Sequence, residues 1–274
     1  MPDPVMRDLH LNVRSTGTGR PVVLIHGWPL SGEAWDKQVP DLVAAGYRVI
    51  TYDRRGFGHA DHPSDGFDYD TLTSDLAKIL EGEDLKNVTL VGFSMGGGEV
   101  ARYISLYGEE RLNSVVLAAA VPPFMMQSAD NPEGPLTQAK AQEMEAGLKA
   151  DRAKFFDGFT KAFFSANGVL KVTEAKRQEA IVICQQSDQA AAIGCMKAFA
   201  TTDFRDDLAN ISVPTLVLHG DADGVVPFAG SGQRTHRAVG QSELVVISGA
   251  PHGMNVSHAD EFNAALIKFL NKHS

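Results

Sequence analysis

The chain has 274 residues, of which 43% are hydrophobic and 22% charged, a composition typical of a globular protein with a sizeable core. Its formal net charge is −9 and no basic cluster is longer than Arg54-Arg55, which argues against nucleic acid as a partner. The longest nearly unbroken apolar stretch, 115–126, is too short to cross a bilayer and contains two prolines, so we expect no membrane association.

Targeting and redox signals point to an ordinary intracellular protein. Residues 1–8 lack the apolar centre of a signal peptide. The two cysteines, Cys184 and Cys195, lie in a helix-like region about three turns apart, so that they can share a face. Their spacing fits neither a metal site nor a redox pair, and we expect two buried free thiols. The predicted location is therefore cytoplasmic.

Short apolar runs alternate with helical patterns along most of the chain. First, the alternating segment 9–14 ends in a Thr/Gly-rich turn and predicts an antiparallel strand at a sheet edge. Runs rich in Val, Ile and Leu predict buried strands at 21–27, 47–53, 88–92, 113–120, 214–219 and 243–248. Helical patterns lie between them, at about 33–45, 70–82, 95–107 and 259–271. This order is typical of an α/β fold whose mostly parallel sheet is flanked by helices on both faces.

The alternation is interrupted between residues 122 and 205. This stretch shows no convincing strand and predicts helices at 137–149, 151–164, 173–186 and 188–200. We interpret it as a helical cap, so that 1–121 and 206–274 form the core and 122–205 the cap. Phenylalanines 155, 159 and 163 form a stripe in it, with 156 and 164 alongside. Most of these rings are expected to pack the cap against the core, and one or two to line a substrate pocket.

The segment Gly92-Phe93-Ser94-Met95-Gly96 is the most informative in the chain, because it stands between a predicted strand and a predicted helix. A serine on so tight a turn has a strained backbone, and the residues two before and two after it must be very small. Its hydroxyl then lies beside a helix N-terminus, where backbone N–H groups can face an oxyanion. The pattern predicts that Ser94 is a nucleophile.

A serine hydroxyl needs a base, and the base needs an orienting acid. In open α/β sheets these groups follow the carboxyl ends of strands, here in the chain order serine, acid, histidine. Of the nine histidines, His252 meets both conditions through a short Gly/Pro loop. Asp221 and Asp223 both follow the preceding strand. We prefer Asp223 because Asp221 is placed to cap its own tight turn, whereas the residue two further on has room to reach the histidine.

The competing histidines fit less well. His219 precedes both candidate acids and breaks the expected order. His258 lies at the expected start of the last helix, where we predict a capping or supporting role. The remaining ones lie near the termini, in loops or in a helix-like stretch, and we expect His26 to anchor its loop.

The oxyanion requires two N–H donors. One is expected from Met95, the residue after the nucleophile. The other should come from the loop after the 21–27 strand, and Trp28 is the candidate because it lies just past the strand end. Pro29 follows it and limits how the Trp28 peptide can be oriented. The ring of Trp28 can also serve as a packing aromatic.

Six motifs, in this order, resemble those of the bacterial α/β-hydrolases grouped as cofactor-free haloperoxidases, aryl esterases, perhydrolases and certain γ-lactamases. They are HGWP at 26–29, YDRRGFG at 52–58, VGFSMGGG at 91–98, TDFR at 202–205, HGDAD at 219–223 followed by VP at 226–227, and APHG at 250–253. The resemblance implies Ser94, Asp223 and His252 as the triad, and Trp28 and Met95 as the oxyanion donors. It also implies a structural role for 53–55, and a homo-oligomer.

The resemblance favours a serine hydrolase that acts on small carboxylic esters, without metal or cofactor. No His/Asp/Glu cluster in the sequence has the spacing of metal ligands. Relatives of this kind also form peracids from a carboxylic acid and hydrogen peroxide, and a proline after the oxyanion residue, here Pro29, favours that reaction. Perhydrolysis and γ-lactam opening are therefore the alternatives. A non-catalytic receptor is remote because the triad is complete, and the serine nucleophile disfavours haloalkane dehalogenase chemistry.

Overall fold

The computed structural model describes residues 9–273, and the expected α/β architecture is confirmed. The expectation that no signal peptide is present concerns 1–8 and lies outside the described residues. A seven-stranded sheet has the order β1-β3-β2-β4-β5-β8-β9, in which only the β1–β3 pair is antiparallel. Its strands are β1 (Arg14–Thr16), β2 (Pro21–Ile25), β3 (Arg48–Thr51), β4 (Val88–Phe93), β5 (Leu112–Ala118), β8 (Thr215–Gly220) and β9 (Glu243–Ile247).

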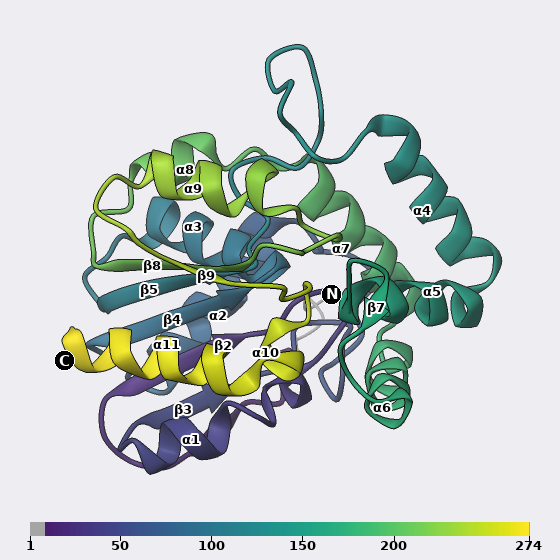
Figure 1. Cartoon of the computed structure of the whole chain (residues 1–274). Coiled ribbons are helices and arrows are strands. Elements are labelled where there is room, and N and C mark those ends of the chain that lie inside the picture. Colours follow the sequence, from purple (N-terminus) through teal and green to yellow (C-terminus); the bar gives the residue numbers. More distant parts are fainter. Residues whose placement is uncertain (1–8, 274) are drawn as a thin grey trace, which may run out of the picture.

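The central strands are buried because helices cover both faces of the sheet. Every residue of β4 and of β8 is buried, which explains why these strands read as nearly continuous apolar runs. Figure 1 shows helices below the sheet and above it, and a further helix packs on α3. They are α1 (Val39–Ala44) and α11 (Ala259–Lys272) below, α3 (Met95–Tyr107), α8 (Arg205–Ala209) and α9 (Gly232–Ala238) above, and α2 (Tyr69–Gly82) against α3.

Two N-terminal elements differ from their predictions. The edge strand is Arg14–Thr16 and not 9–14, since Asn12 has a φ of 45° that interrupts an extended backbone. The predicted helix at 33–45 is two pieces, the 3₁₀ helix η1 (Gly32–Trp35) and α1. Pro40 explains the break, because a proline is tolerated in the first turn of a helix but not in its interior.

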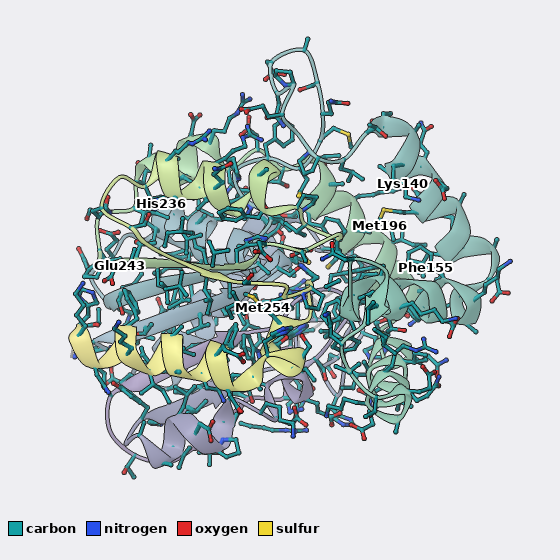
Figure 2. All side chains as sticks on the ribbon, viewed as in Figure 1. Lys140, Phe155, Met196, His236, Glu243 and Met254 are labelled. Carbon is teal, nitrogen blue, oxygen red and sulfur yellow. The ribbon has the colours of Figure 1, made fainter. Side chains whose placement is uncertain are left out.

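Between β5 and β8 lie four long helices close to their predicted ranges. They are α4 (Gln138–Ala150), α5 (Arg152–Phe164), α6 (Glu174–Gln185) and α7 (Gln189–Thr201). A Thr or Asp side chain accepts a backbone N–H at the N-terminus of each helix, which fixes where it begins. We refer to this helical segment as the cap. Figure 2 shows Phe155 and Met196 on it, and Met254 near its junction with the core.

The cap also contains features that the sequence reading missed. Two short strands, β6 (Ser165–Ala166) and β7 (Val169–Leu170), form a hairpin where no strand was predicted. The turn between them is Asn167-Gly168, with φ of 53° and 78°, a pair that strongly favours hairpins. Cys184 and Cys195 are buried free thiols as expected, but they lie on two helices, α6 and α7, and not on one face.

Candidate active site

Ser94 stands on the sharp turn that joins β4 to α3. Its φ of 55° and ψ of −118° place it in a strained region for a residue with a side chain. The glycines on either side are required by close packing. A Cβ on Gly92 would lie 2.5 Å from the carbonyl oxygen of Gly96, and one on Gly96 would lie 2.5 Å from that of Ile25. The chain therefore forms the strand–turn–helix elbow that the sequence predicted, with Ser94 at its apex.

His252 and Asp223 meet Ser94 at the carboxyl end of the sheet. His252 follows β9 and Asp223 follows β8, so each arrives from the end of its own strand. Ser94 Oγ lies 2.9 Å from His252 Nε2, and His252 Nδ1 lies 2.6 Å from Asp223 Oδ2. The side chains of Asp223 and His252 are fully buried, and Ser94 retains 6% exposure. The three side chains form one continuous hydrogen-bonded line.

The second oxygen of Asp223 fixes the carboxylate in place. Oδ1 accepts the backbone N–H groups of Val225 and Val226, both at 2.8 Å. Burial by itself would raise the pKa of Asp223, but the charge on His252 and the hydrogen bonds from His219 and His252 hold that pKa well below its usual range. The carboxylate is thus ionised throughout the neutral range, as an acceptor for His252 Nδ1–H must be.

Asp221, the other candidate acid, has a different position. Its Oδ1 accepts the backbone N–H of Gly249 at 2.6 Å, and its Oδ2 lies 3.2 Å from Ser248 Oγ. The expectation that it caps its own turn is therefore wrong. The carboxylate instead ties the end of β8 to the loop that carries His252.

His219 is buried beside the candidate triad, although its position in the chain order made it a poor candidate for the base. Its Nε2 lies 2.9 Å from the carbonyl oxygen of Val226 and 3.4 Å from Asp223 Oδ2. Its Nδ1 is buried and has no hydrogen-bond partner in the described part of the chain, so the proton belongs on Nε2. The signal was present in the sequence as a histidine four residues before the acid, at the end of the same strand.

The two predicted oxyanion donors, Trp28 and Met95, both lie close to Ser94. A Cβ on Gly27 would lie 3.0 Å from the Cβ of Ser94, so the loop after β2 runs directly beside the serine. Within residues 9–273, the backbone N–H groups of Trp28 and Met95 have no protein acceptor among the hydrogen bonds. The Trp28 ring contacts four cap phenylalanines, including Phe159 and Phe199, and its Nε1 donates to Ala192. Trp28 therefore also packs against the cap.

A buried charged network holds the loop after β2, which carries Trp28, in place. Arg54 forms an ion pair with Glu99 on α3 and donates to the carbonyl oxygen of His26, while its backbone N–H donates to His26 Nε2. Burial raises the pKa of Glu99, and the neighbouring Arg54 opposes that shift. This geometry agrees with anchoring roles for His26 and Arg54.

His258, for which a capping or supporting role was predicted, occupies the N-cap position of α11. Its side chain accepts no hydrogen bond from the helix and pairs with Ser257 Oγ instead.

The triad opens into a small cavity of about 50 Å³ between the core and the cap. That is several times the roughly 10–15 Å³ that a water molecule needs, and suits a group of a few heavy atoms. Its walls are apolar except at the serine and histidine. They are formed by Trp28, Ser94, Val121, Met125, Leu136, Met144, Phe159, Phe199, Val225, Val226 and His252. Phe159 is thus the stripe residue that lines this cavity.

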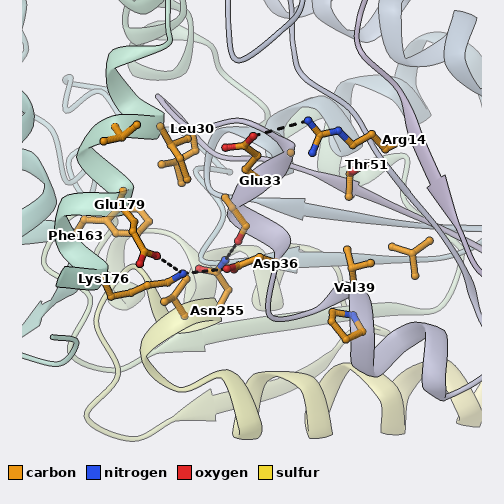
Figure 3. Close-up of a pocket in the computed structure, with 18 of the residues that line it drawn as sticks. Arg14, Leu30, Glu33, Asp36, Val39, Thr51, Phe163, Lys176, Glu179 and Asn255 are labelled. Carbon is orange, nitrogen blue, oxygen red and sulfur yellow. Dashed lines mark hydrogen bonds and ion pairs between the residues drawn. The ribbon is translucent and has the colours of Figure 1, made fainter.

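A larger hollow of about 700 Å³ lies between α6 and the edge of the core formed by η1, α1 and β3. Figure 3 shows Lys176 and Glu179 on the cap side and Val39 and Thr51 on the core side. None of the candidate triad or oxyanion residues lines it, so we do not assign the reaction to it. Phe163 lines the hollow, and its ring lies 5.2 Å from that of His252.

Two kinds of feature are absent from residues 9–273. No group of three or more His, Cys, Asp or Glu side chains is arranged to hold a metal ion. No helix in this range has the length and apolar character needed to cross a membrane.

Comparison with known proteins places the chain among relatives of similar length. The family model for the α/β-hydrolase fold matches residues 20–259. A non-heme chloroperoxidase from Kitasatospora aureofaciens is 41% identical over 99% of this chain and 100% of its own. A bifunctional esterase/perhydrolase from Acinetobacter calcoaceticus is 35% identical over 91% of each chain. The crystal structure of a bromoperoxidase from Bacillus anthracis superimposes with a TM-score of 0.95 and 52% identity, covering 97% of both chains. The chain therefore belongs to the α/β-hydrolase family of enzymes.

Proposed function

We propose that this enzyme hydrolyses small carboxylic esters through an acyl-enzyme on Ser94. The observation that carries the proposal is the continuous buried line from Ser94 Oγ through the His252 ring to Asp223 Oδ2. His252 takes the serine proton as Oγ attacks the carbonyl carbon, and returns it to the leaving alcohol. Asp223 keeps the proton of His252 on Nδ1, so that Nε2 is free to accept.

The backbone N–H groups of Trp28 and Met95 stabilise the oxyanion of the tetrahedral intermediate. Both lie beside Ser94 and have no competing protein acceptor in the described residues. Donors fixed in a site that excludes water contribute more than they would in bulk solvent, and losing one costs about 10²–10³ in kcat.

The acyl group occupies the small cavity, whose volume and apolar walls favour short chains such as acetyl or propionyl. We propose that the two predicted domains supply different parts of the site. The core, 1–121 and 206–274, supplies the triad and the oxyanion donors, and the cap, 122–205, supplies Met125, Leu136, Met144, Phe159 and Phe199 to the cavity wall. The cap therefore determines which acyl groups fit.

Perhydrolysis is the second candidate on the same residues, with hydrogen peroxide in place of water as the acceptor of the acyl group. The named activities of the relatives from Kitasatospora aureofaciens and Acinetobacter calcoaceticus support it. So does the apolar lining of the cavity, which offers bulk water few hydrogen-bond partners. Absence of metal and cofactor, a homo-oligomer and a cytoplasmic location stay predictions.

The experiment is an activity panel with short-chain p-nitrophenyl esters, acetate plus hydrogen peroxide, and a bicyclic γ-lactam. Ester cleavage is expected to exceed lactam opening, and Ser94→Ala should lower each rate by roughly 10³–10⁶. If Ser94→Ala kept most of the ester activity, the proposed mechanism would be wrong. If lactam opening dominated, the substrate assignment would be wrong but the triad would stand.

A further inference from the structure

Two thioether side chains line the cavity in which Ser94 would react. Met125 lies just after β5 and is 4% exposed, and Met144 lies on α4 of the cap and is half-buried. Both share the wall of the 50 Å³ cavity with Ser94 and His252. A species formed at Ser94 therefore shares this small cavity with both methionines before it can leave.

The proposed reaction with peroxide would form a peracid, a strong oxidant, next to Ser94. Hydrogen peroxide attacks the acyl carbonyl of the Ser94 ester, its proton passes to His252, and the carbonyl carbon–Oγ bond breaks. Oγ takes the proton back from His252 and a peracid is released. The terminal oxygen of a peracid is electrophilic, and a methionine sulfur is a soft nucleophile that oxidises readily to the sulfoxide.

We propose that Met125 and Met144 are sulfoxidised by the peracid formed at Ser94, so that peroxide turnover modifies the enzyme's own cavity. This inference rests on the proposed perhydrolase activity. In the step, the sulfur lone pair attacks the terminal peracid oxygen and the O–O bond breaks. The proton on that oxygen passes to the departing carboxylate. Sulfur loses two electrons, the peracid is reduced to the carboxylic acid, and the methionine carries one added oxygen.

The modification should inactivate the enzyme. A sulfoxide places a polar oxygen in a cavity whose walls offer it almost no hydrogen-bond donors, which is unfavourable. It also occupies room that the acyl group needs. Both ester cleavage and peroxide turnover should therefore decline with the number of peroxide turnovers completed, and not with the time of exposure to peroxide.

The chain contains matched internal controls. Met126 follows Met125 directly and is more exposed, at 9%, yet it does not line the cavity. Met196 on α7 is 3% exposed, close to Met125, and also lies outside the lining. Oxidation from bulk solvent should favour Met126 over Met125, whereas oxidation from inside the cavity should favour Met125.

The test incubates the full-length enzyme with acetate and hydrogen peroxide in the presence of excess free methionine, which consumes any peracid that escapes. Peptide mass spectrometry then measures the sulfoxide fraction at each position. We expect severalfold more sulfoxide at Met125 and Met144 than at Met126 and Met196. Leaving out acetate, or using Ser94→Ala, should remove the excess at Met125. At Met144, which is half-buried and so more exposed, the sulfoxide fraction should fall to the level that peroxide alone produces.

The double variant M125L/M144L should complete severalfold more peroxide turnovers before inactivation than wild type, whereas M126L should match wild type. Peracid formation is followed separately, without free methionine, by the oxidation of bromide. If peracid forms but the sulfoxide fractions match those of the Ser94→Ala enzyme, this inference fails alone. If no peracid forms, the perhydrolase proposal fails with it.

Discussion

The substitution Asp223→Asn tests how the acid controls the histidine. Asp223 Oδ1 accepts two backbone N–H groups, from Val225 and Val226, so the oxygen of an asparagine must take that position. The amide nitrogen then faces His252 Nδ1, where the carboxylate oxygen stood at 2.6 Å. An N–H donor there stabilises the tautomer that carries its proton on Nε2. That tautomer cannot accept the proton of Ser94.

The expected effect is large because the pair is fully buried and no water can replace the lost acceptor. A triad that holds the wrong tautomer loses on the order of 10⁴ in kcat. At about 1.4 kcal/mol for each tenfold change, this corresponds to roughly 5.5 kcal/mol of transition-state stabilisation. The KM for a short ester should change little, since Asp223 is not part of the cavity wall.

Asp221→Asn is the matched control, two residues away on the same loop. Its carboxylate binds Ser248 and Gly249 and does not contact His252, so we expect a loss of less than about tenfold. The assay is steady-state cleavage of p-nitrophenyl acetate, with thermal melts to verify that both variants fold. A larger loss in Asp221→Asn than in Asp223→Asn would refute the assignment of the acid.

Three further outcomes are expected. Gly92→Ala should lower the free energy of unfolding in urea by more than about 3 kcal/mol, because its Cβ would lie 2.5 Å from backbone atoms. The control Gly82→Ala has open space around the new Cβ and should change this free energy by less than about 1 kcal/mol. Leu136→Ala should enlarge the cavity and raise kcat/KM for the p-nitrophenyl butyrate ester, relative to the acetate ester, roughly tenfold. An unchanged ratio would show that Leu136 does not contact the acyl group. His219→Leu removes one of the hydrogen bonds that hold the pKa of the Asp223 carboxyl low, and should lower kcat about tenfold with little change in KM. His219→Gln should restore part of the loss, and an unchanged kcat in His219→Leu would reduce His219 to a packing residue.

Local steric rules made the geometry of the candidate triad predictable from sequence. The elbow requires tiny residues at Gly92 and Gly96, and the chain order of α/β sheets requires an acid and a histidine after later strands. These constraints act within a few residues or on the order of strands, so a single sequence contains them. The choice between Asp221 and Asp223 depended on a difference of two positions in one loop, and the structure brings only Asp223 to His252.

Features that depend on the tertiary structure were harder to predict. The cavity wall combines side chains from the β2 loop, α4, α5, α7 and several loops, which share no spacing in the sequence. The position of the edge strand depended on the backbone angle of Asn12, which no pattern of apolar residues reveals. The hairpin at Asn167-Gly168 was predictable from its turn residues and was missed, because each of its strands has only two residues.

The central claim is that Ser94 is the nucleophile, and covalent trapping tests it most directly. Wild-type enzyme is treated with a fluorophosphonate until ester cleavage stops, and the labelled peptide is identified by mass spectrometry. We predict one phosphonyl group per chain on the peptide that carries Ser94, loss of activity in proportion to labelling, and no label on Ser94→Ala. Label on another residue in proportion to lost activity, or an active enzyme that takes up no label, would contradict the account.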